Sequence, residues 1–484
     1  MKKICVSLVF VLLTSCVAGF SACGTSGKNI SEYDITCSLE GNVLTGTEKI
    51  TYLNGSDNTV SEIKFNLYGN AFRQGAAYPP VSPQYASKAY PDGKSFGEMT
   101  VSNVTSNGKS LEFFIEGVDK NVLTVSLGEE LFPDERVSME IEYTLSLANV
   151  IARTGCNDKT INLANFYPIL CAYDEDGFYE CVYYPNGDPF YSDCADYTVT
   201  LTADSEYVVA ASGKVICSSE KDGKRTSTYK IEKARSFAFV LSKEFESVTD
   251  DSTGTDIIYY YYDDANPEKS IEYAVKSVKL FNEKYGRYVY PVYSVVQTKF
   301  IQGGMEFPAL VMISDDLESA AYGEVIVHET AHQWWQTAVG NNEIKYGFLD
   351  EGLAEYSVVV FYENYPEYSY TRESLISSTE KTYKIFCSVY DKLFGNVDTT
   401  MLRALNEYSG EYEYVNIAYI KSCIMYDYLR TTIGDERFFR GLKNYYSQFC
   451  YKNAEPYDIV GVFEKIGADA NGFFQSFYDG KVII

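Results

Sequence analysis

The chain contains only two histidines, His328 and His332, and Glu329 lies between them. Positions i and i+4 of an α-helix share one face, one turn apart, so both imidazoles can reach a single metal ion. The Glu beside them can act as a base for a water molecule at that ion. The plainer alternative is a buried helix that happens to carry two histidines. The spacing predicts a helix over residues 322–338 and a zinc hydrolase.

A catalytic zinc site needs a third protein ligand and one open position. The chain has no further histidine and no C-x-x-C cysteine pair, so a carboxylate is expected to be the third ligand. Glu351 is the best candidate, in a helix that we expect to begin near Asp350. Glu355 lies one turn further on the same face. We expect it to accept a hydrogen bond from the far ring nitrogen of His328, or else to be an ordinary surface carboxylate.

The pattern of apolar residues changes once along the chain. From about Ile35 to Phe245, short runs alternate apolar and polar residues and are broken by Gly, Asn and Asp, which is typical of an antiparallel β-sandwich. Helical spacing follows from Pro267 to Tyr285, then strands over 292–296 and 310–313, and the last third is mostly helical. We predict an α+β fold.

Two domains follow from this change of pattern, together with a targeting segment at the N-terminus. We expect a β-domain over 33–248 and a catalytic domain with an α/β fold over 249–484. Residues 1–22 begin with two lysines before an apolar run, and this resembles a bacterial lipoprotein signal peptide. A flexible tether would occupy 23–32.

The cysteine at the end of the targeting segment, Cys23, is the expected lipidation site, and Cys16 also fits the pattern. An uncleaved transmembrane anchor is the other reading. In each case the protein would lie outside the cytoplasm and be attached to the cell membrane, most simply through lipid. The net charge of −26 argues against nucleic acid and against an anionic membrane surface as partners. We therefore expect membrane contact only through the anchor.

Nine cysteines would remain after processing, and an odd number implies a free thiol or few disulfides. Cys181 and Cys194 flank a turn-rich stretch and could form a bridge.

Several motifs together resemble a known family. H-E-x-x-H followed after 18 residues by Glu351 is similar to the gluzincin peptidases of the aminopeptidase N family. Gly-Gly-Met-Glu-Phe at 303–307 resembles the family's G-x-M-E-N, and Tyr419-Ile-Lys-Ser resembles its Y-x-K-G. Residues 188–197 and 237–240 also match. The resemblance covers essentially the whole mature chain and implies a saddle-like β-domain followed by a thermolysin-like catalytic domain.

The resemblance also implies the roles of the site residues. One Zn²⁺ per chain would be held by His328, His332 and Glu351, with Glu329 as general base. The phenol of Tyr419 would stabilise the oxyanion, with Tyr414 as an alternative donor. Peptide substrates would be bound through the α-ammonium group at Glu306, with Gly303, Gly304 and Met305 beside it. This implies a zinc aminopeptidase.

The chain departs from the family pattern in three places. Phe307 replaces the Asn of G-x-M-E-N, and Ser422 replaces the Gly of Y-x-K-G. Only 65 residues follow Tyr419, so the large helical domain that roofs the site in full-length family members is expected to be absent. A more open cleft leaves two alternatives to an aminopeptidase: a zinc endopeptidase, or a non-catalytic peptide-binding surface protein.

Overall fold

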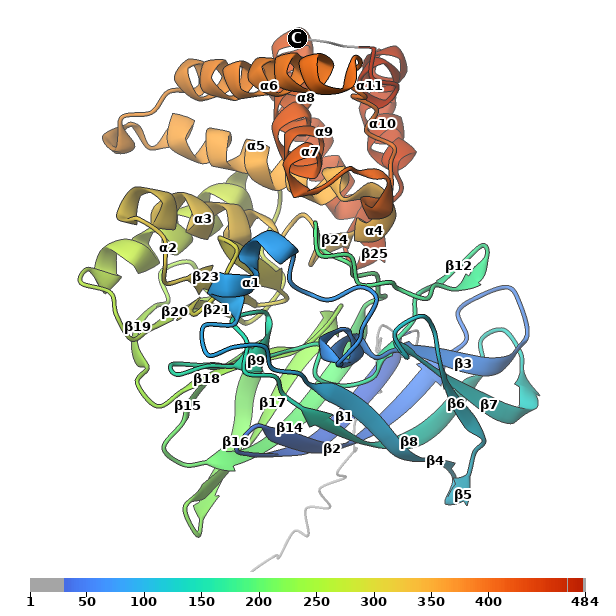
Figure 1. Ribbon diagram of the computed structural model, residues 1–484. Coiled ribbons are helices and arrows are strands. Elements are labelled where there is room, and N and C mark those ends of the chain that lie inside the picture. Colours follow the sequence, from blue (N-terminus) through green and yellow to red (C-terminus); the bar gives the residue numbers. More distant parts are fainter. Residues whose placement is uncertain (1–29, 468, 482–484) are drawn as a thin grey trace, which may run out of the picture.

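The computed structural model describes residues 30–467 and 469–481, and it consists of a β-rich layer beneath a mainly helical one (Figure 1). The predicted signal peptide, both candidate lipidation sites and residues 23–29 of the predicted tether lie outside the described residues. The first strand, β1 (Ser31–Glu40), begins inside the predicted tether. Ser31 and Glu32 therefore belong to the sheet.

An eight-stranded sheet forms the base of the β-domain, in the order β16-β17-β14-β1-β2-β8-β4-β5. Its strands are β1, β2 (Val43–Leu53), β4 (Glu98–Ser106), β5 (Lys109–Ser110), β8 (Arg136–Ser146), β14 (Ala195–Asp204), β16 (Lys214–Lys221) and β17 (Lys224–Ala234). All neighbouring strands are antiparallel except β1 and β14, which are parallel. The antiparallel prediction is wrong at this pair, because the long connection between the two strands lets β14 return in the same direction.

Two four-stranded sheets complete the sandwich. One has the order β15-β18-β10-β9 and the other β11-β3-β7-β6. Their strands are β3 (Val60–Asn66), β6 (Phe113–Glu116), β7 (Val122–Leu131), β9 (Thr154–Cys156), β10 (Ile161–Ala164), β11 (Ile169–Leu170), β15 (Val208–Ala211) and β18 (Ala238–Ser242). Tyr229 of β17 packs edge-on against Phe239 of β18, with 5.3 Å between ring centroids. The inner side chains of β1 alternate with exposed ones, as a half-buried strand requires.

A five-stranded sheet supports the catalytic domain, in the order β19-β20-β21-β23-β22. Its strands are β19 (Glu246–Asp250), β20 (Asp256–Tyr261), β21 (Val292–Thr298), β22 (Gly304–Phe307) and β23 (Leu310–Ser314). The strands predicted at 292–296 and 310–313 are present. Strands β20, β21 and β23 are parallel, and β22 runs antiparallel to β23 at the edge of the sheet. An edge strand leaves one side of its backbone open to a ligand.

Helices cover this sheet and form the upper layer in Figure 1. The longer ones are α2 (Pro267–Lys284), α3 (Ser319–Ala331), α5 (Phe348–Asn364), α6 (Arg372–Phe394), α8 (Ser422–Ile433), α9 (Asp435–Phe449), α10 (Pro456–Lys465) and α11 (Asn471–Tyr478). Within the described residues, no helix is both long and apolar enough to cross a membrane. The motif helix α3 is shorter than the predicted 322–338, because the chain turns sharply after His332, with φ of 118° at Gln336.

The cysteines of the described chain are all free thiols. The bridge considered between Cys181 and Cys194 is therefore not formed, and both thiols are buried. Within the part of the chain that the structure describes, the apolar core therefore stabilises the fold without disulfide bonds.

Candidate active site

The three predicted zinc ligands converge on one point. His328 lies on α3, His332 caps its C-terminal end and Glu351 lies in the first turn of α5. The Nε2 atoms of the two histidines are 3.1 Å apart. Oε2 of Glu351 lies 3.3 Å from Nε2 of His328 and 3.2 Å from Nε2 of His332. Ligands about 2.0–2.1 Å from a tetrahedral zinc ion are separated by about 3.3 Å. The donor set and its spacing therefore fit zinc, with the fourth position open to the cavity.

Each imidazole is held through its other ring nitrogen. Nδ1 of His332 lies 2.9 Å from the main-chain oxygen of Trp335, and Nδ1 of His328 lies 3.3 Å from Oε2 of Glu355. Both partners are acceptors, so they favour the tautomer that carries hydrogen on Nδ1. The Nε2 lone pairs are thereby left for the metal.

Glu329 lies beside the ligand cluster and is buried. Its Oε2 has no hydrogen-bond partner within the described residues. Burial raises its pKa to about 7, against the lowering effect of the two histidines. A Cβ atom at position 304 would collide with this carboxylate, so any residue larger than Gly304 would displace the Glu329 side chain.

Tyr419 lies in a π-helical segment, Val415–Lys421, and its hydroxyl donates to Oε1 of Glu351 at 2.5 Å. Its ring stacks on that of His328, with 5.9 Å between centroids and 8° between planes. Tyr414, at the end of α7 (Glu411–Tyr414), also lines the cavity, and its ring lies edge-on to Tyr419. Of the two phenols, Tyr419 is the one bonded to a ligand.

Glu306 projects from the edge strand β22 into the cavity. It is 4% exposed, and its Oε1 has no partner within the described residues. Burial raises its pKa well above the ordinary value. Gly303 and Gly304 also line the cavity. Met305 does not, contrary to its predicted role: strand alternation turns its side chain into an apolar cluster on the other face of β22.

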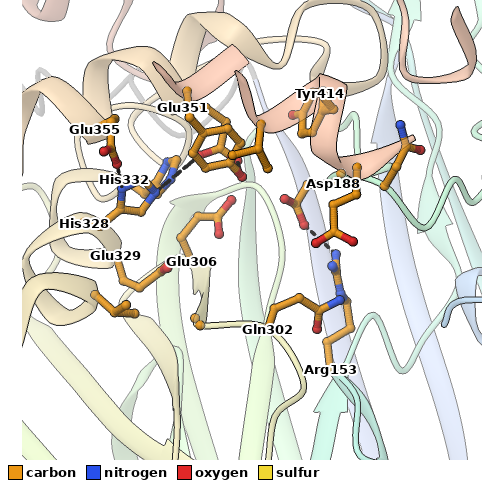
Figure 2. Close-up of a pocket in the computed structure, with 18 of the residues that line it drawn as sticks. Arg153, Asp188, Gln302, Glu306, His328, Glu329, His332, Glu351, Glu355 and Tyr414 are labelled. Atoms are coloured by element: carbon orange, nitrogen blue, oxygen red, sulfur yellow. Dashed lines mark hydrogen bonds and ion pairs between the residues drawn. The ribbon is translucent and has the colours of Figure 1, made fainter. Parts of the chain in front are cut away.

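The site residues line a cavity of about 280 Å³ (Figure 2). Arg153 and Asp188 lie on the side of Glu306 away from the histidines, and both come from the β-domain. The Nη1 atom of Arg153 donates to Oδ1 of Asp188 at 2.6 Å, and its guanidinium lies over Phe190. Sequence reasoning did not assign these residues to the site. The match of Asp188-Pro189 to the family was the available signal.

Residues 269–477 match the description "Peptidase family M1 domain". Aminopeptidase M1-A of Oryza sativa subsp. japonica is 27% identical over 238 residues, which are 46% of this chain and 26% of that protein. Endoplasmic reticulum aminopeptidase 2 of Homo sapiens is 26% identical over 229 residues, 43% and 23% of the two chains. The chain thus spans about a quarter of the length of these curated relatives.

Solved structures are similar over nearly the whole fold. An M1 zinc metallopeptidase from Deinococcus radiodurans superposes with a TM-score of 0.67 at 18% identity, covering 94% of this chain and 95% of that one. A mutant of that protein bound to a Tyr-Ser-Ala substrate gives a TM-score of 0.66 at 18% identity, with the same coverage. At this identity the likeness concerns the fold, and it confirms the predicted order of a β-domain followed by a catalytic domain.

Proposed function

This chain carries a peptidase family M1 domain over residues 269–477, and on that premise we propose that it is a zinc aminopeptidase, which removes N-terminal residues from peptides. The observation that carries the proposal is the carboxylate of Glu306. It lies in the same cavity as the zinc ligands, is almost fully buried, and has an oxygen with no partner in the described chain. A buried carboxylate of this kind calls for a cation, and a free peptide α-ammonium group supplies one.

A zinc ion held by His328, His332 and Glu351 would supply Lewis-acid activation of water and of the scissile carbonyl. Glu329 lies beside these ligands, and its free Oε2 can take the proton of the attacking water. It then transfers that proton to the leaving amine. Tyr419 can turn its hydroxyl from Glu351 to the carbonyl oxygen as negative charge develops there.

The decisive experiment compares one peptide with a free and with an acetylated N-terminus. Acetylation removes the ammonium group and leaves Glu306 unpaired, so the acetylated peptide should be a poor substrate. A charge-assisted hydrogen bond of about 1.5–3 kcal/mol corresponds to roughly a ten- to hundredfold change in kcat/KM. Glu306→Ala should lose that factor for the free peptide, and a zinc chelator should abolish turnover.

One result would replace the proposal with another activity. If the natural protein cleaved the acetylated peptide equally well at an internal bond, the protein would be an endopeptidase with an open cleft. If neither peptide were cleaved although zinc was bound, the remaining alternative would be a non-catalytic peptide-binding protein. The presence of Glu329 beside a complete ligand set favours catalysis, because peptide binding alone does not need a base.

The site of action is a separate proposal. Lys2, Lys3 and the apolar run after them support a lipoprotein signal, which would anchor the protein outside the cytoplasm through Cys23. Metabolic labelling with a radioactive fatty acid tests this in the producing cell. We expect label on the natural protein and on Cys16→Ser, and none on Cys23→Ser. Label lost only in Cys16→Ser would move the anchor to Cys16.

A further inference from the structure

The charges that line the cavity are strongly unbalanced. Seven carboxyl side chains face it, together with a single basic side chain other than the two histidines, Arg153. Arg153 is already paired with Asp188. Even with a divalent zinc ion added, negative groups therefore outnumber positive ones. A cavity of this kind attracts cationic ligands and repels anionic ones, most strongly at low ionic strength.

Most of these carboxylates have a role in the proposed mechanism or an ion pair; Glu324 and Glu411 have neither, and Glu411 is the one held by the β-domain. It begins α7, its Oε2 accepts from Nε2 of Gln84 at 2.7 Å, and its Oε1 accepts from the hydroxyl of Tyr85 at 3.1 Å. Gln84 and Tyr85 belong to a 3₁₀ helix of the β-domain, η2 (Pro83–Tyr85). Both donors are neutral, and no basic side chain of the described chain lies within ion-pair distance of Glu411. Its position is fixed while its charge remains uncompensated.

Glu411 lines the same cavity as Glu306. The segment 185–188 of the β-domain also lines it, and Asn186 donates through Nδ2 to the main-chain oxygen of Leu405. Pro185, Asn186 and Glu411 also line the neighbouring surface hollow, so the Glu411 carboxylate lies where the cavity meets that hollow. Asp188 lines the cavity but not the hollow, and it lies toward Glu306 in Figure 2.

A second feature shows that the cavity is built to receive a cation. The Glu306 side chain is 4% exposed, faces this cavity and has an oxygen without a partner in the described chain. Glu306 and Glu411 therefore both line the cavity without a cationic partner, the first buried and the second where the cavity meets the neighbouring hollow. Arginine and lysine as first residues carry two matching charges: the α-ammonium group and a cation at the end of a long, flexible side chain.

We propose that the preferred substrates are peptides whose first residue is arginine or lysine, with the side-chain cation paired to Glu411 and the α-ammonium group to Glu306. This inference rests on the proposed aminopeptidase function. It also means that peptides beginning with aspartate or glutamate are poor substrates, because their side chains would add negative charge to a cavity lined by carboxylates that have no cationic partner.

The test uses the zinc-loaded full chain and aminoacyl fluorogenic amides of Arg, Lys, Met and Glu. Met is the matched neutral substrate, since its side chain is unbranched and flexible. We expect kcat/KM for Arg and Lys to exceed that for Met by about tenfold or more, with Glu lowest. The Arg-to-Met ratio should fall as salt concentration rises. In Glu411→Gln the ratio should collapse toward one.

Three further variants make the result specific. Glu436→Gln makes the same charge change on an exposed carboxylate of α9 and should leave the ratio unchanged. Tyr85→Phe removes one hydrogen bond to Glu411 and should lower the ratio less than Glu411→Gln does. Glu324→Gln tests another cavity-lining carboxylate that has no ion-pair partner within the described residues, on α3. If Glu324→Gln abolished the preference and Glu411→Gln did not, the assignment to Glu411 would be overturned.

Failure of this inference is distinguishable from failure of the proposed function. Equal hydrolysis of the Met, Arg and Lys substrates would leave an aminopeptidase without the charge preference and would refute the inference alone. No hydrolysis of any free-amine substrate, with zinc bound, would refute the aminopeptidase itself.

Discussion

The Nε atom of Arg235 donates a 2.8 Å hydrogen bond to the main-chain oxygen of Gln336. The residue before it, Trp335, supplies the main-chain oxygen that lies beside Nδ1 of His332. Arg235 directly follows β17 and so belongs to the β-domain. Gln336 has a φ of 118°, which is costly for a residue other than glycine. Its own N–H donates to the oxygen of Val339, and its side chain to Glu343. These contacts hold the turn that directs the Trp335 carbonyl toward Nδ1 of His332.

Removal of the Arg235 guanidinium should weaken zinc binding. In Arg235→Met the turn loses its anchor, and His332 loses its fixed orientation, so we expect roughly a tenfold loss of zinc affinity or more. Competition with a chelating dye measures the zinc affinity independently of enzymatic activity. Asn453→Ala is the matched control, because it removes another Arg235 partner and leaves the bond to Gln336. Equal losses in both variants would show that Arg235 acts only on the domain interface.

Glu355 offers a second test of how the ligands are oriented. Its carboxylate lies beside Nδ1 of His328, and partners of this kind typically contribute ten- to a hundredfold to metal affinity. Glu355→Ala should therefore bind zinc about ten- to a hundredfold more weakly, as measured by chelator competition. Unchanged affinity would mean that Glu355 is an ordinary helix carboxylate.

Tyr419 and Tyr414 can be separated by their kinetics. Tyr419→Phe removes the hydroxyl bonded to Glu351 and should lower kcat by roughly a hundredfold, while zinc content stays at one per chain. Tyr414→Phe keeps that hydroxyl and should have a much smaller effect. The reverse order of effects would make Tyr414 the group that stabilises the oxyanion. Steady-state kinetics on zinc-saturated protein decides between them.

Glu48, on the inner face of β2, makes the stability of the β-domain depend on pH. Its side chain is fully buried, both carboxyl oxygens lack partners in the described chain, and burial raises its pKa well above 4.5. The folded state therefore keeps a proton that the unfolded state releases above about pH 4.5. The free energy of unfolding should therefore fall by about 1.4 kcal/mol per pH unit between pH 4.5 and the raised pKa of Glu48.

Glu48→Gln removes this proton release and keeps the shape of the side chain. The variant and the natural protein should be about equally stable near pH 4.5, and the variant should be the more stable one at pH 7. Urea unfolding followed at several pH values measures the difference. A constant difference across this range would mean that Glu48 is ionised in the folded protein.

Local spacing was enough to predict that His328, His332 and Glu351 converge, because their positions depend on a single pair of helices, α3 and α5. The β-sandwich followed from alternation, which a half-buried sheet imposes on any sequence. The parallel pairing of β1 with β14 was not predictable in this way, since it depends on partners more than 150 residues apart. The same is true of Arg153 and Asp188, which reach the cavity only because the two domains pack together. Met305 was misassigned because a motif match does not state which face of a strand a side chain occupies.

Substrate selectivity in this chain would depend on a contact between the two domains, formed by Gln84 and Tyr85 with Glu411. Glu411, which would bind the side chain of the first substrate residue, belongs to the catalytic domain. Its carboxylate is nevertheless held in place by two side chains of the β-domain. A mutation at either end of this contact can alter selectivity without touching the catalytic groups. The two domains are therefore expected to co-evolve as one unit, and exchanging the β-domain for that of a relative should weaken the preference, because Glu411 would lose the two side chains that hold it.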